Sequence, residues 1–276
     1  MAILLSLLAA LSYGLADFCG GLASKRGSAW GVALVACATG AVLVLTMSLF
    51  MGGDPTAADL RWGAVAGVGN GFGTAFLYRG LSSGRMGVVA PVSGVGAAVI
   101  PVVVGVLLGE RPAVLVWAGM VLAIPAIWLV ARDPSGRSAA SPGGAVDGAL
   151  AGLGFGFLFV ALAQVSEDSG LLPLAVNQVV AGVVIVLVAT LLGQSWRPHP
   201  SAAVGGTLAG VLGALATVCF LFATREGYLS IASVVTSLYP AFTVVLAASV
   251  LREHVHRAQA AGLLMCALAV SLVAAG

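Results

Sequence analysis

Charged residues divide this chain into long uncharged stretches, and their placement constrains the fold more than any other feature. Of 276 residues, 12 are basic and 10 are acidic. With Asp17 set aside, the other charges leave ten uncharged stretches, each long enough for a helix to cross a bilayer at about 1.5 Å per residue. These stretches are residues 1–24, 27–53, 62–78, 86–109, 112–131, 148–166, 169–196, 198–224, 227–251 and 258–276.

The composition indicates that most of the surface faces lipid. Charged residues make up 8% of the chain and hydrophobic residues 60%, with a mean hydropathy of +1.11. Soluble domains carry about 25% charged residues, so the composition excludes a soluble enzyme, a nucleic-acid binder and a disordered protein. The apolar runs do not alternate as the strands of a barrel would. Because backbone groups in lipid must pair internally, we predict an all-α polytopic membrane protein with ten transmembrane helices.

One polar segment divides the predicted helices into two groups of five. Residues 132–147 are rich in Ser, Pro and Gly, which is typical of a flexible linker. We therefore expect a first five-helix unit at 1–131, a linker at 132–147 and a second unit at 148–276. Residues 1–24 lack a basic start and a cleavage site, so we interpret them as a retained helix rather than a signal peptide.

The two units match as an internal repeat. At an offset of 143, the ladder Gly63, Gly67, Gly71 falls on Gly206, Gly210, Ala214, and Glu110 falls on Glu253. An offset of 142 places Tyr13-Gly14 on Phe155-Gly156. Tandem copies with an odd number of helices insert in opposite orientations, so we predict two inverted five-helix repeats. This plan recurs in secondary transporters, which bind substrate between the repeats near the bilayer midplane.

The chain also resembles the EamA-type members of the drug/metabolite transporter superfamily. The resemblance rests on Tyr13-Gly14 and Phe155-Gly156, on Pro91, Pro101 and Leu108-Gly109-Glu110, and on Tyr239-Pro240 and Leu251-Arg252-Glu253. It implies a multi-pass carrier of small metabolites in a bacterial inner membrane. Amino-acid exporters, including those for aromatic amino acids, are the nearest comparison that it suggests, with a monomer as the plausible state.

Basic residues predict the orientation. Nine Lys and Arg residues lie in odd-numbered loops and three in even-numbered loops. Because positively charged loops stay in the cytoplasm, we expect the linker on the cytoplasmic side and both termini on the periplasmic side.

Asp17 is the one acid well inside an apolar stretch, and it shares a helix face with Tyr13. Ionisable groups within membrane spans are costly and often functional. Asp17 is therefore a candidate for proton coupling or for pairing with a substrate ammonium group. The alternative is a residue near the helix end that water reaches or that pairs with Lys25 or Arg26.

Further polar residues are candidates for lining a substrate cavity. Asn70, Thr74 and Tyr78 share one face of the third helix, and Ser237 and Tyr239 accompany Ser93 of the equivalent helix. Pro91 and Pro240 lie near these hydroxyl groups and are candidate hinges, since proline removes a backbone donor. The alternatives are interhelical hydrogen bonding and simple packing kinks. Lower-ranking candidates are Gln164, Asn177 and Gln178.

Other chemistries lack their motifs. The only lysine is Lys25, and no nucleotide-binding P-loop surrounds it, so we expect neither nucleotide, cofactor nor metal. Glu110 and Glu253 follow helices beside Arg111 and Arg252, where we expect ion pairs. We expect small-molecule substrate and the lipid bilayer as partners. The alternative function is an integral-membrane enzyme acting on lipid-linked substrates, with Asp17, Glu167 and Asp168 as its acids.

Overall fold

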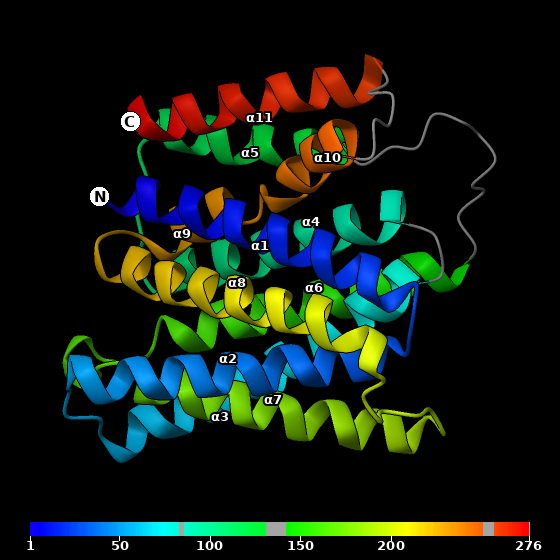
Figure 1. The fold of residues 1–276 in the computed structure, drawn as a ribbon. Coiled ribbons are helices and arrows are strands. Elements are labelled where there is room, and N and C mark those ends of the chain that lie inside the picture. Colours follow the sequence, from blue (N-terminus) through cyan, green and yellow to red (C-terminus); the bar gives the residue numbers. More distant parts are fainter. Residues whose placement is uncertain (83–85, 131–141, 251–256, 276) are drawn as a thin grey trace.

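The protein is a bundle of helices that lie along one common axis (Figure 1). The computed structural model describes residues 1–82, 86–130, 142–250 and 257–275, and these contain no strand. Their elements are α1 (Ala2–Ser24), α2 (Ala29–Met51), α3 (Ala57–Ser82), α4 (Met86–Leu107), α5 (Val114–Val130), α6 (Pro142–Leu162), the short 3₁₀ helix η1 (Glu167–Ser169), α7 (Leu172–Leu191), α8 (Pro200–Arg225), α9 (Leu229–Thr236), α10 (Tyr239–Val250) and α11 (Arg257–Ala275).

Successive helices run back and forth between the two ends of the bundle. Both termini lie at one end in Figure 1, which we call the terminal side, together with the loops at 52–56, 108–113, 163–171 and 226–228. The loops at 25–28 and 192–199 lie at the other end, which we call the linker side. Consequently α1 starts on the terminal side and α6 on the linker side, which is the relation expected of inverted repeats.

The packing of the helices obeys a twofold pattern. In the second repeat, α6, α7 and α8 are the equivalents of α1, α2 and α3, and α9 with α10 is the equivalent of α4. The contacts of α1 and α2 with α8 match the contacts of α6 and α7 with α3. The contact of α4 with α6 likewise matches the contact of α9 and α10 with α1. The equivalent helices α2 and α7 pack on each other, and so do α5 and α11. The same helix–helix surfaces are therefore used twice, which confirms a polytopic protein built from two repeats.

The ninth predicted helix is broken into two pieces, so the described residues form eleven α-helices rather than ten. α9 ends at Thr236, and α10 begins at Tyr239. Pro240 has no N–H to donate, which interrupts the helical bonding pattern at this point. At the repeat offset of 143, Pro240 corresponds to Ala97, within the continuous helix α4.

Apolar side chains cover the outside of the bundle. Leu4, Leu8 and Leu11 of α1 are exposed, and so are many large hydrophobic residues on the other helices. Such a surface suits lipid, since soluble monomers rarely expose large apolar patches. Within the described residues, four helices are long and apolar enough to cross a membrane: Ala2–Ser24, Ala29–Met51, Leu172–Leu191 and Ala203–Arg225. Five shorter apolar helices accompany them.

Glycines allow α3 and α6 to cross at close range. A Cβ added at Gly154 would lie 2.6 Å from the carbonyl oxygen of Gly69 and 2.7 Å from the Cα of Gly73. Small residues permit this backbone approach in membrane bundles. The contact brings helices of different repeats together at mid-bundle.

Some of the predicted features lie outside the described residues. These are most of the proposed linker at 132–147, and Arg252 and Glu253 with their expected ion pair.

Candidate functional site

A small cavity with several polar residues in its wall lies at mid-bundle between the two repeats. It has a volume of about 50 Å³, which is room for a few water molecules. Three helices of each repeat line it, namely α1, α2 and α3 of the first and α6, α7 and α8 of the second. The lining residues are Tyr13, Ala16, Asp17, Ala36, Cys37, Asn70, Thr74, Leu77, Tyr78, Phe155, Gln178, Ala209, Gly210, Gly213, Ala214 and Thr217.

Asp17 is the acid of this cavity. Its side chain is buried, with 7% of the residue exposed, and its Oδ2 atom has no hydrogen-bond partner. The other two buried acids of the described chain are well satisfied. Asp147 pairs with Arg79, while Asp59 accepts hydrogen bonds from Thr56 and Ser166. An unpaired buried carboxylate is costly, so Asp17 differs from the acids that hold the fold together.

A cluster of amide side chains forms another part of the wall. Asn70 Nδ2 donates to Asn177 Oδ1 at 3.3 Å and to Gln178 Oε1 at 3.2 Å. Thr74 donates its hydroxyl to Asn70 Oδ1 at 3.2 Å. These bonds join α3 to α7, so the predicted polar face of α3 both borders the cavity and holds two repeats together.

Two tyrosines complete the polar wall from the first repeat. The Tyr13 hydroxyl lies 2.9 Å from Thr217 Oγ1 in a hydrogen bond. Tyr78 fits against Gly20, where an added Cβ would collide with the phenol. The structure thus brings five of the predicted site residues, Tyr13, Asp17, Asn70, Thr74 and Tyr78, to one cavity.

Of the other predicted residues, Gln178 also lines the cavity, whereas Ser93, Ser237 and Tyr239 lie beside it rather than in its wall. Ser93 and Tyr239 form a buried hydrogen bond of 2.9 Å between their hydroxyl groups. Tyr239 also contacts the Tyr13 ring edge-on, with 6.3 Å between ring centres. The Ser237 hydroxyl is buried without a partner.

The two predicted hinge prolines differ in whether the helix around them is continuous. α4 continues through Pro91 without interruption, whereas the helix is broken next to Pro240. A hinge at either position stays a prediction.

The two repeats contribute different chemistry to the cavity. Asn70 corresponds to Gly213, Asp17 to Phe159, and Tyr78 to Leu221. Phe159 instead stacks on Phe220 with 4.2 Å between ring centres, in an apolar cluster next to the cavity. The first repeat therefore supplies the carboxyl group and the two phenols of the wall, and the second supplies Gln178, Thr217, Phe155 and several small residues.

Polar contacts tie the loops together on the terminal side. Asp59 accepts hydrogen bonds from the Thr56 N–H and hydroxyl and from the Ser166 N–H. These donors hold the pKa of Asp59 below its usual range. Arg225 donates to the Ser166 carbonyl at 2.8 Å and to Ser169 Oγ at 3.2 Å. The start of α3 is thereby joined to the loop after α6 and to the end of α8.

Glu110 caps α9 across the repeat boundary, which the sequence did not predict. Its Oε1 accepts from the Leu229 N–H at 2.7 Å and its Oε2 from the Ser230 N–H at 3.1 Å. The expected ion pair with Arg111 was wrong, because the Arg111 side chain donates to the Glu110 backbone carbonyl instead. The N-terminus of a helix attracts a carboxylate through its free N–H groups and its dipole.

The turn before Glu110 aims its side chain at α9. Gly109 has a φ of 101°, and the Glu110 N–H bonds back to the Gly105 carbonyl at 3.0 Å. This αL glycine and its 6→1 bond are features of a Schellman motif. Gly105 also leaves room for the Glu110 carboxylate, which an added Cβ would hit.

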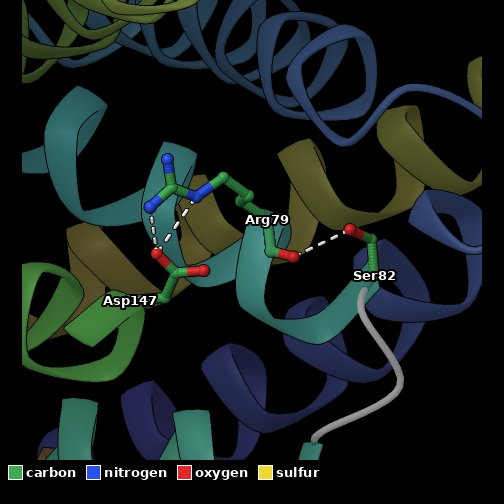
Figure 2. Close-up of polar contacts among 3 residues, drawn as sticks. All are labelled: Arg79, Ser82 and Asp147. Atoms are coloured by element: carbon green, nitrogen blue, oxygen red, sulfur yellow. Dashed lines mark hydrogen bonds and ion pairs between the residues drawn. The ribbon is translucent and has the colours of Figure 1, made fainter. Parts of the chain in front are cut away.

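An ion pair joins α3 to α6 on the linker side. Figure 2 shows Arg79 directed at Asp147, with two guanidinium nitrogens bonded to one carboxylate oxygen. The guanidinium also lies 4.4 Å from the centre of the Phe76 ring. Arg79 follows Tyr78 in sequence, yet it is not among the residues that line the cavity, and its charge is neutralised by Asp147.

The acids proposed for an enzyme do not meet. Asp17 lies about 22 Å along α1 from its terminal-side start. Glu167 and Asp168 are exposed in the loop after α6 on that terminal side.

The lining residues that sequence reasoning missed are Cys37 and Gly213. Thr217 and Phe155 were visible only as repeat counterparts of Thr74 and Tyr13.

Comparison with known proteins supplies the family. A model described as the EamA-like transporter family matches the chain twice, over residues 1–132 and 143–275. A search of curated proteins finds no match. The chain is similar to a solved structure described only as the crystal structure of a protein, with 19% identity and a TM-score of 0.72. The alignment covers 99% of this chain and 95% of that one, and at this identity the likeness shows the fold alone.

Proposed function

Since the chain belongs to the EamA-like transporter family of the drug/metabolite transporter superfamily, and is accordingly a membrane transporter of small molecules, we propose that it is a secondary carrier. It moves its substrate by alternating access, with one repeat moving against the other around the central cavity. The substrates that the sequence resemblance implies are amino acids and similar metabolites, aromatic ones included.

The position of the cavity is the observation that supports this proposal. It lies at mid-depth between the repeats, where secondary carriers with inverted repeats bind substrate. Its volume of about 50 Å³ is smaller than an amino acid needs, so the surrounding helices must separate for substrate to enter. Opening the cavity to one side of the membrane and then to the other would break first the helix contacts at one end of the bundle and then those at the other end.

We assign Asp17 the role of coupling acid and Tyr13, Asn70, Thr74 and Tyr78 the role of lining residues. Ser93, Ser237 and Tyr239 support the wall from α4 and the broken ninth helix, with Pro91 and Pro240 as hinges. The other titratable groups that face the cavity are Tyr13, Tyr78 and Cys37. Asp17 is the one carboxylate among the lining residues, which favours it as the group that exchanges a proton with bulk solvent.

Proteoliposomes test the proposal. Saturable flux of unmodified solute that is stimulated by solute on the opposite side supports a carrier, while product formation without flux would support an enzyme. Asp17→Asn is expected to abolish flux driven by a pH gradient, whereas exchange of solute for solute should persist when the solute is supplied at saturating concentration. If the dependence on the pH gradient survives in Asp17→Asn, another group couples transport to protons.

We also propose an orientation in a bacterial inner membrane. The linker side carries most of the Lys and Arg residues, so it lies in the cytoplasm and the termini lie in the periplasm. The unit boundaries 1–131, 132–147 and 148–276 belong to this proposal. A C-terminal reporter that is active only in the cytoplasm should give no signal, and a strong signal would reverse the orientation.

A further inference from the structure

The central cavity contains one acidic group and no basic group. Among the described residues that line it there is no Lys, Arg or His. Arg79, the cation that adjoins the lining residues in sequence, is bonded to Asp147. Lys25 and Arg26 are exposed at the end of α1, two turns beyond Asp17. Nothing in the wall therefore balances the Asp17 carboxylate.

From this imbalance we infer the substrate class: the site binds the cationic amino group of its cargo through Asp17 and prefers amines that lack a carboxylate to the amino acids that the sequence resemblance implies. The inference rests on the proposed transport function. The unpartnered Oδ2 atom of Asp17 is the acceptor for the ammonium group. A charge-assisted hydrogen bond to this atom satisfies a buried group that the fold leaves without a donor.

The aromatic part of the wall suits the same ligand. Tyr13, Tyr78 and Phe155 line the cavity with Asp17, and each comes from a different helix. Aromatic faces attract a desolvated ammonium group through their quadrupole.

A zwitterion fits this wall less well than an amine. In an α-amino acid the carboxylate and ammonium share one carbon, so a bond between the ammonium and Asp17 brings two carboxylates close together. Like charges in a partly buried site repel strongly. The amide N–H groups of Asn70, which could offset this repulsion, already donate to Asn177 and Gln178.

Gly213 marks where the apolar body of the cargo can lie. It lines the cavity, and an added Cβ there would meet no atom within 4 Å. Most helical glycines in the bundle are packed against neighbouring backbone or side chains. The Cβ of a larger residue at position 213 would therefore enter open space at the cavity rather than a packed helix contact.

Binding of four related probes to the purified full chain in nanodiscs tests the inference. The probes are phenethylamine, phenylalanine methyl ester, phenylalanine and 3-phenylpropionate, which share an aromatic body and differ in their charges. Phenethylamine and the ester are expected to bind at least about tenfold more tightly than phenylalanine, and 3-phenylpropionate should not compete. Equal or tighter binding of phenylalanine, or no binding of either amine, would overturn the inference.

Variants connect the selectivity to the cavity. Asp17→Asn should weaken phenethylamine binding at least about tenfold and remove its advantage over phenylalanine. Gly213→Leu should also weaken it, while Gly182→Ala serves as the control, because a Cβ at Gly182 meets only ordinary contacts of 3.6 Å or more. A melting temperature close to that of the unmodified protein establishes that each variant is folded.

Unchanged amine binding in Asp17→Asn would reject the inference, whatever the result for Gly213→Leu. The proposed transport function fails separately, if proteoliposomes show no saturable flux of any solute. Saturable flux of phenylalanine that is indifferent to phenethylamine would keep the transport function and reject amine recognition.

Discussion

The cap that Glu110 places on α9 gives a quantitative prediction. Replacing Glu110 by Ala removes both acceptors of the Leu229 and Ser230 N–H groups. The substitution leaves these two donors at the start of an eight-residue helix without their partners. Since Glu110 belongs to the first repeat and α9 to the second, the change also removes a connection between repeats on the terminal side.

The structure sets the expected magnitude. Hydrogen bonds to charged groups contribute about 1.5–3 kcal/mol each, and loss of an N-terminal cap costs about 0.5–2 kcal/mol. Glu110 is half-buried, so solvent compensates part of the loss. We expect Glu110→Ala to lower the free energy of local opening of α9 by about 2 kcal/mol. Glu110→Gln should lower it by about 1 kcal/mol, because its amide oxygen still accepts one N–H.

Hydrogen exchange of the protein in detergent measures the effect. A loss of 2 kcal/mol corresponds to an approximately 30-fold increase in local opening, which should appear in peptides covering Leu229–Thr236. Glu226→Ala is the matched control, since Glu226 is an exposed acid in the loop before α9. Exchange of α9 that changes less than about threefold in Glu110→Ala would refute the capping argument, because that range lies well below the expected change.

Three further predictions concern the fold. Gly154→Ala should lower the free energy of unfolding by about 1–3 kcal/mol, because the added methyl group forces α3 and α6 apart. Gly182→Ala is the control, and equal stability of the two variants in equilibrium unfolding would contradict this prediction. Asp59→Asn should lower the free energy of unfolding by about 1–3 kcal/mol, because the charge-assisted hydrogen bonds of Asp59 are lost. The loss should appear as a lower melting temperature at neutral pH. Because the folded-state pKa of Asp59 is lowered, its stabilisation is present above about pH 4 and lost as the pH falls below that value. The melting temperature of Asp59→Asn should therefore fall less on acidification, and parallel pH profiles would count against the assignment.

Much of the fold was predictable because the membrane imposes simple rules. Ten uncharged stretches predict ten membrane-spanning segments. Because the first five segments match the last five in sequence, and five is an odd number, the two repeats must have opposite orientations in the membrane. The break at Pro240 shows where this reasoning stops. Proline was visible in the sequence at Pro91, Pro101, Pro125 and Pro240, but only at Pro240 does the structure divide the helix. Whether a proline kinks or breaks a helix depends on how neighbouring helices satisfy the freed backbone groups.

The site was predictable in part for a similar reason. Asn70, Thr74 and Tyr78 share a helix face by spacing alone, and Asp17 stands out because it lies in an apolar stretch. Spacing within one helix does not say which other helix that face meets. Ser93, Ser237 and Tyr239 have the same polar character, yet the contact between α4 and the start of α10 joins Ser93 to Tyr239 outside the cavity wall.

The sequence by itself determined the membrane environment, the repeat and the family, because these depend on composition, on the spacing of charges and on motifs that a linear comparison detects. Tertiary structure alone decided which acid is left without a partner. Asp59 and Asp147 are satisfied by Ser166 and Arg79, residues 107 and 68 positions away in the chain, whereas no donor reaches Asp17 Oδ2. It also decided where the cavity opens, since Gly213 resembles every other helical glycine until its neighbours are known. Both properties depend on which atoms other helices bring within a few ångströms, which spacing along one chain does not encode.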